Sequence, residues 1–297
     1  MELSRTEIIQ ISIMFTIGFI SLLSSLSVIF TILKKNLYKS LAFKILLYIS
    51  INDSIRSLIG FLPPELIYNS YLCDLIGFLS YAVFVSNIIW GCSLSYTIYQ
   101  IVVLENSEFE KFHKYWFIFA YFVPFGINLL PFITSSYGYG DHVCELKEDF
   151  DGNIWRFLVF YVPATSLFAV SGVLFYKTYK KIKLMRSDAM KTVIFERGFV
   201  YPVSIALVTI PYGLIRVVHF FLKSEILNLV ALIFYLICVM HGCVNAFIFF
   251  SNRTVKEVIK NKNKHIYASM GIAAEDECTL KISFRSTLSN SEYNKFK

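Results

Sequence analysis

The longest stretch of this chain without a charged side chain is residues 75–104, between Asp74 and Glu105. Thirty residues of α-helix are about 45 Å long at a rise of about 1.5 Å per residue. A bilayer has a hydrocarbon layer of only about 30 Å, so a helix of this length must tilt within the membrane or protrude from it. The segment 73–103 is therefore expected to be a tilted central helix of a membrane bundle.

The composition also indicates a membrane protein. Of the 297 residues, 56% are hydrophobic and 16% are charged, and the mean hydropathy is +0.59, which is too apolar for a water-soluble domain. The formal net charge of +7 comes largely from basic residues in short segments between apolar runs. Orientation in a bilayer explains this distribution better than nucleic-acid binding does, and nucleic acid is excluded as a partner.

Seven apolar runs are each long enough to cross a bilayer. They cover residues 8–33, 41–63, 73–103, 115–134, 154–176, 199–222 and 227–250. We predict an all-α membrane protein, a seven-transmembrane-helix bundle within a receptor domain of residues 1–264. Residues 265–297 are predicted to be a disordered cytoplasmic tail, since they combine many Ser and Thr residues with few apolar ones.

The basic residues of the connections give the bundle an orientation. Sixteen Lys and Arg residues lie on one side and three on the other. The positive-inside rule then places the N-terminus outside the cell and the C-terminus in the cytosol, in a multi-pass protein of the plasma membrane in contact with its lipids. After the last run, Val255, Val258 and Ile259 alternate with lysines at helical spacing, which predicts a short amphipathic helix on the inner membrane surface.

Cys73 and Cys144 are the two cysteines that fall outside the bilayer on the outer side. Disulfides persist in that oxidising compartment, and no other outer cysteine competes, so we predict a bond between them. The alternative is a pair of free thiols. The bond would hold the connection 135–153 across the mouth of the bundle.

Ionisable side chains inside a membrane are costly and often functional. Two groups of polar intramembrane residues stand out. The first is a set of ligand-pocket candidates facing outward: Arg56, Asn87, Trp90, Arg216 and His219. The second is a polar network nearer the inner side: Asn52, Asp53, His241 and Asn245.

Structural roles remain open for both groups. Asp53 and Arg56, three residues apart on one helix face, could neutralise each other, and Arg216 could extend to the lipid headgroups. His241 and Asn245 are four residues apart, so hydrogen bonding between helices is favoured over catalysis.

The inner side offers candidates for contact with a cytosolic partner or with anionic lipid. They are two tyrosines at the end of the third run and a basic surface that extends from the fifth: Tyr96, Tyr99, Lys180, Lys181, Lys183, Arg186 and Lys191. The sequence contains no zinc motif, phosphate-binding glycine loop or nucleophile elbow. Neither an enzyme nor a metal or cofactor site is expected.

Several stretches resemble one receptor family. They are NLYKSLAFKILLYISIND at 36–53, WRFLVFYVP at 155–163, the pairs Tyr201-Pro202 and Ile210-Pro211 with Arg216, and GCVNAFIFFSNRTV at 242–255. Together they resemble the G-protein-coupled receptors of the slime-mould cyclic-AMP-receptor-like group, with a more distant likeness to secretin and adhesion receptors. The likeness extends in order over residues 8–260.

The resemblance implies that Cys73 and Cys144 form the family's conserved bridge, and that Tyr201, Pro202, Pro211 and Arg216 match its sixth-helix pattern. Where the family has tryptophans beside the outer-loop cysteine, this chain has Val143 and Glu145, so cyclic AMP is not carried over as the ligand. The Asp-Arg-Tyr and Asn-Pro-x-x-Tyr motifs of rhodopsin-like receptors are absent.

The sequence thus favours a receptor that transmits the binding of an unknown extracellular ligand to intracellular heterotrimeric G proteins. A seven-helix transporter or channel for small solutes is the alternative, because Asp53, Arg56 and Arg216 could line a permeation path. Transporters usually contain internal repeats, and none is visible in this chain.

Overall fold

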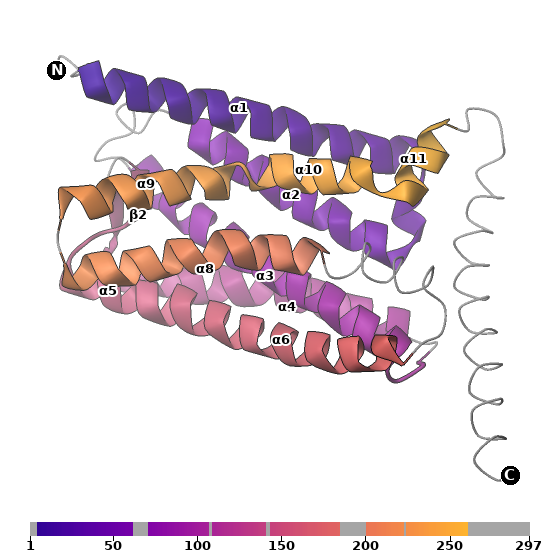
Figure 1. The fold of residues 1–297 in the computed structure, drawn as a ribbon. Helices are drawn as coiled ribbons and strands as arrows, with labels where there is room; N and C mark the ends of the chain where they lie inside the picture. Colours follow the sequence, from indigo (N-terminus) through magenta and orange to yellow (C-terminus); the bar gives the residue numbers. More distant parts are fainter. Residues whose placement is uncertain are drawn as a thin grey trace, which may run out of the picture.

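The computed structural model describes residues 5–61, 71–106, 109–140, 143–184, 200–222 and 224–260. Long helices lie side by side as a bundle (Figure 1). They are α1 Arg5–Lys34, α2 Leu41–Phe61, α3 Tyr71–Val102, α4 His113–Leu129, α6 Val162–Lys183, α8 Val200–Phe221, α9 Glu225–Val239 and α10 His241–Ser251. The shorter elements are η1 Leu37–Lys39, η3 Phe109–Phe112, η4 Leu130–Thr134, β1 Tyr137–Gly140, β2 Val143–Leu146, α5 Phe150–Arg156, η5 Phe157–Tyr161 and α11 Arg253–Lys260.

Within the described residues, six helical segments are long and apolar enough to cross a membrane. They are Ile11–Lys34, Tyr71–Val102, His113–Thr134, Phe150–Lys183, Val200–His219 and Leu229–Ser251. A seventh helix, α2, has 21 residues, about 31 Å of helix, but it contains Lys44, Asp53 and Arg56. The prediction of a mostly helical membrane bundle is therefore confirmed.

Helix α3 is at the centre of the bundle, as its uncharged sequence indicated. It packs against α2, α4, α6, α8 and both strands. Every residue from 82 to 95 is buried, and consecutive residues of a helix point in all directions around its axis. The middle of α3 is therefore covered on all sides.

The outer connection contains a two-stranded antiparallel hairpin, which the all-α prediction missed. Strand β1 pairs with β2 so that Tyr139 is opposite Cys144, and β2 lies at the end of the bundle opposite α11 (Figure 1). The hairpin approaches α3 at Gly77, where a Cβ atom would lie 3.0 Å from the Tyr137 ring and 3.3 Å from the Glu145 Cα. A glycine at this position lets the hairpin lie directly against the helix.

Two of the predicted spans are interrupted. The run 154–176 consists of α5, the π-helical turn η5 and α6; Pro163, at the start of α6, lacks the N–H that would continue an α-helical ladder, which favours an irregular turn before it. The run 227–250 is divided into α9 and α10 at Met240. Just beyond, a Cβ atom on Gly242 would lie 2.7 Å from the Ser21 hydroxyl, so glycine permits α10 to pack closely on α1.

The short helix expected after the last run is present as α11. Its Val255 is fully buried and its Lys256 is exposed. The predicted tail, residues 265–297, lies outside the described residues.

Candidate functional site

The outer hairpin is fixed to the bundle by the disulfide between Cys73, in the first turn of α3, and Cys144 in β2. The predicted bond is therefore confirmed, with 5.1 Å between the two Cα atoms. Burial raises the pKa of the neighbouring Tyr137 phenol. The phenol therefore keeps its proton and donates a 2.9 Å hydrogen bond to the Asn128 carbonyl at the end of α4.

Glu145, the residue after the bridged cysteine, is buried between two arginines. Its carboxylate pairs with Arg216 of α8 and lies 3.5 Å from the guanidinium of Arg156 in α5. The Tyr81 hydroxyl of α3 lies 3.5 Å from the other carboxylate oxygen and accepts a 3.2 Å hydrogen bond from Arg156 Nε. A single carboxylate thus joins β2 to α3, α5 and α8.

Glu148 extends this cluster along α8. Its carboxylate lies 3.3 Å from the Arg216 guanidinium and 3.8 Å from Nδ1 of His219. Arg216 and His219, both expected near an outer pocket, are indeed close together and buried. Arg216 therefore binds carboxylates of the outer connection and does not extend to the headgroups.

Arg56 lines a small cavity beside this cluster. Its guanidinium lies 4.2 Å above the ring of Phe84, and the cavity has a volume of about 40 Å³. Glu145, Tyr81, Tyr212 and Tyr235 contribute polar side chains to the lining. A volume of this size holds a few water molecules and is much smaller than pockets for drug-sized ligands, which are about 300–1,000 Å³.

The structure places the other two pocket candidates elsewhere. Trp90 is fully buried and stacks on Tyr48 of α2, with ring centroids 4.7 Å apart, inside an aromatic cluster between α2, α3 and α4 that includes Tyr121. Asn87 belongs to the polar network described next. Both point from α3 toward α2 and not into the outer cavity, a direction that residue spacing alone does not determine.

Asp53 is the centre of the inner polar network. One carboxylate oxygen accepts a 2.8 Å hydrogen bond from Asn87 and lies 3.1 Å from His241 Nδ1. The other oxygen accepts a 2.6 Å hydrogen bond from Asn245. The carboxylate thus links α2, α3 and α10 through these three residues, and Arg56, three residues further along α2, acts on it as a nearby positive charge.

Asn52 extends the network by donating a 3.0 Å hydrogen bond to Ser86 on α3. Its amide oxygen lies 3.5 Å from the Tyr121 hydroxyl of α4. Of the four residues expected in this network, Asp53, His241 and Asn245 contact one another, whereas Asn52 has separate partners, Ser86 and Tyr121.

Comparison with known proteins identifies the family. The sequence pattern of the family described as slime mold cyclic AMP receptor matches residues 1–286. The chain belongs to this family. The family resemblance predicted from the sequence is thereby confirmed.

Two curated relatives from Dictyostelium discoideum align with part of this family member. Cyclic AMP receptor 1 is 27% identical and cyclic AMP receptor 2 is 28% identical, each over 86 residues that make up 29% of this chain. The aligned part spans about a fifth of each relative, 21% and 22% of their lengths.

A solved structure supports the fold. The crystal structure of squid rhodopsin superposes on this chain with a TM-score of 0.68 and 14% identity. The match covers 88% of this chain and 87% of the rhodopsin chain.

At the end of the bundle that is predicted to be cytosolic, α3 is joined to α4 and α6. Tyr96 accepts a 2.6 Å hydrogen bond from Gln100 and packs against Phe112 and Trp116. The Lys177 ammonium lies 5.7 Å from the centre of the Tyr99 ring.

The predicted basic surface is described only in part. Lys181 pairs with Glu105 at 3.3 Å, and Lys180 and Lys183 are exposed at the end of α6. Arg186 and Lys191 lie outside the described residues.

Sequence reasoning missed Glu145 and Arg156 as members of the outer cluster. Glu145 is one of several acidic residues in the connection 135–153, and Arg156 stands near the start of an apolar run. Two signals could have indicated them. Glu145 follows a cysteine that is tied to the bundle, and an arginine within an apolar run requires a partner.

Proposed function

We propose that this protein is a seven-helix receptor of the plasma membrane that converts the binding of an extracellular ligand into activation of heterotrimeric G proteins. The crossings would be α1, α2, α3, α4, α5 to α6, α8, and α9 with α10. Family membership and the rhodopsin-like fold support this assignment. The excess of basic residues in the connections supports an extracellular N-terminus.

The observation that carries the proposal is the contact of the buried Glu145 with Arg216 and Arg156. It connects the outer hairpin to α8, the helix that contains Pro211 and begins just before Pro202. A change at the outer surface therefore acts directly on a helix that can bend.

The cluster also suggests the chemistry of the ligand. Arg156 and Arg216 face two carboxylates, Glu145 and Glu148, and Arg56 lines the small cavity beside them. An anionic ligand with hydrogen-bonding groups could replace the Glu145 carboxylate beside Arg216. Because the cavity is too small for such a ligand in this arrangement, α8 must move relative to the hairpin, which the disulfide holds on α3.

Activation then follows as a shift between two arrangements. In the active one, the inner end of α8 moves away from α3 and opens a cleft beside the basic end of α6 for the G protein. The ligand favours this arrangement only by binding it more tightly than the resting one.

The test is nucleotide exchange on co-expressed G proteins, with and without candidate anionic ligands. We expect exchange that depends on the receptor. The absence of exchange in every G-protein class, with the receptor present at the cell surface, would overturn the proposal. The transporter alternative gains no specific support, since Asp53 and Arg216 are both buried in contacts with other side chains of the protein.

A further inference from the structure

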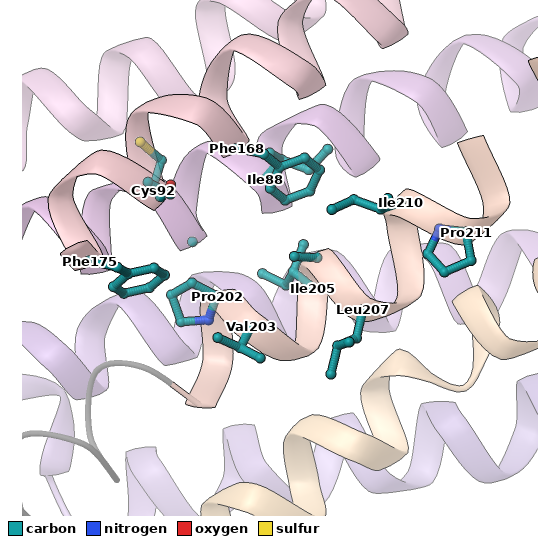
Figure 2. A pocket seen from close by; sticks show the side chains of 14 residues that line it. Ile88, Cys92, Phe168, Phe175, Pro202, Val203, Ile205, Leu207, Ile210 and Pro211 are labelled. Carbon is teal, nitrogen blue, oxygen red and sulfur yellow. The ribbon is translucent and has the colours of Figure 1, made fainter. Parts of the chain in front are cut away.

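A second, apolar cavity lies away from the outer cluster, between α3, α6 and α8. It has a volume of about 340 Å³. Figure 2 shows its side chains around an open space, with Phe175 and Pro202 at one end and Ile210 and Pro211 at the other. No charged residue is among those that line it. A headgroup or an ionic ligand would therefore find no partner there, and the chemistry that fits is hydrocarbon.

The cavity is continuous with the surface that the bilayer covers. Leu207 and Ile210 line it and are 70% and 46% exposed on α8, within the candidate membrane span Val200–His219. The opposite wall is formed by Ile88 and Cys92 of α3, each only 2% exposed. The cavity is thus a groove that leads from the lipid face to the central helix.

The shape of the groove suggests which hydrocarbon occupies it. It extends along α8 from Pro202 to Pro211, about 14 Å of helix. Since α8 begins at Val200 on the side proposed to be cytosolic, the groove lies in the inner half of the span. An elongated apolar space at this depth matches the linear tail of an inner-leaflet phospholipid.

We propose that the groove between α3, α6 and α8 is a lipid site that holds one fatty acyl chain of a phospholipid. The chain contacts Ile88 and Cys92 in the interior of the bundle and lies beside both prolines of α8. Any movement of α8 relative to α6 changes the width of the groove, so the bound chain would also affect that movement. The lipid site itself does not depend on the proposed signalling function.

Two glycines provide a matched pair of variants. A Cβ atom on Gly172, which lines the groove, would have no neighbour within 4 Å, and the same is true of Gly126 in α4. Gly172→Leu therefore fills the groove without a clash at its Cβ, whereas Gly126→Leu adds the same side chain elsewhere. Both changes replace glycine by a better helix former.

The experiment uses the full chain in nanodiscs of phosphatidylcholine with a photoreactive diazirine near the end of one acyl chain. After irradiation, labelled residues are mapped by mass spectrometry. We expect label on Ile88 and Cys92 in the natural protein and in Gly126→Leu, because these buried residues are reached through the groove. Gly172→Leu should lose this label and keep the label on the exposed Leu207 and on Phe122 of α4, which shows that the variant is inserted in the bilayer; a circular dichroism spectrum equal to that of Gly126→Leu shows that it is folded.

Three outcomes would overturn the proposal. The first is an absence of label on Ile88 and Cys92 in the natural protein, and the second is equal label on them in Gly172→Leu. The third is label on these residues from a photoreactive sterol but not from the phospholipid, which would assign the groove to a different lipid.

Discussion

Glu145 shows how strongly a single residue depends on its surroundings. In the sequence it is one of several acids in an outer connection. In the structure it is buried beside Arg156 and Arg216, where each charge is tolerated only because the others are present. The disulfide at the preceding residue holds it in that place.

Replacing Glu145 by Gln should destabilise the fold, because two buried arginines lose their shared counter-charge. We expect a loss of about 3–5 kcal/mol in the free energy of unfolding. Glu148→Gln removes a carboxylate whose side chain is 32% exposed and should cost at most about 1 kcal/mol. Denaturation of the two purified variants, followed by circular dichroism, measures the difference. Equal losses would show that the Glu145 pairs contribute no more than a surface contact.

The sequence predicted some of these residues better than others. Local features were sufficient to predict the disulfide, because the oxidising compartment and the lack of competing cysteines indicate the pair. They were also sufficient to place His241 and Asn245 on one helix face, because the two residues are four positions apart. The outer cluster was only partly predicted, because Glu145 and Arg216 are 71 residues apart. No spacing rule indicates which distant side chains a bundle brings together. For the same reason Asn87 and Trp90 were assigned to the wrong side of α3.

At the scale of elements, the end of α3 that is predicted to be cytosolic has no charged side chain. Its side chains include two tyrosines and one amide: Tyr96, Tyr99 and Gln100. Gln100 donates to Tyr96 and accepts a 3.0 Å hydrogen bond from Asn106, just beyond the helix. Tyr96 in turn packs against Trp116 of α4. The hydrogen bonds lie within α3 and the turn after it, where they fix the Tyr96 side chain, and the packing of its ring on Trp116 joins α3 to α4.

Tyr96→Phe should raise basal signalling, because the variant loses the hydrogen bond from Gln100 and keeps the ring. A loss of about 1 kcal/mol corresponds to roughly a fivefold change in the balance between two arrangements. Tyr99→Phe should raise it less, since phenylalanine retains the ring that faces Lys177. Basal nucleotide exchange at equal surface expression measures both effects. Unchanged exchange in both variants would remove this helix end from the control of the resting state.

The outer hairpin is held to α3 by its disulfide across a separation of 71 residues. Replacing both Cys73 and Cys144 by Ser should lower the free energy of unfolding by about 2–4 kcal/mol and release the strand that carries Glu145. Cys243→Ser, at a partly buried free thiol, is the control and should have little effect. Thermal unfolding of the two purified variants tests this. A stable double variant with ligand response intact would show that packing at Gly77 is enough to position the hairpin.

Most elements could be predicted because the bilayer imposes a length and a polarity on each helix. Helix length and polarity did not predict four features: the hairpin, the π-helical turn before Pro163, the interruption at Met240 and the close packing at Gly242. They depend on contacts between elements, such as Gly77 with the hairpin and Gly242 with Ser21. Apolar runs contain no information about these contacts.

For the whole molecule, the number of crossings depends on α2. This helix contains two charged residues, Asp53 and Arg56, away from its ends. Both side chains contact other residues of the protein. Asp53 is surrounded by Asn87, His241 and Asn245, and the Arg56 guanidinium lies over Phe84 of α3. Partners on α3 and α10 thus offset the free-energy cost of placing these charged groups within a membrane.

The location of the two chain ends tests this count. Six crossings would place the N- and C-termini on the same side of the membrane, whereas a seventh crossing by α2 places them on opposite sides. We expect an N-terminal epitope tag to be detected on intact cells and a C-terminal tag only after permeabilisation, in agreement with the basic connections. A variant with Asp53→Leu and Arg56→Leu is the control, since an α2 without these charges satisfies the usual criteria for a span and should give the same pattern. Detection of both tags on the same side in the natural protein, but on opposite sides in this variant, would show that buried partners do not compensate for the charges of α2.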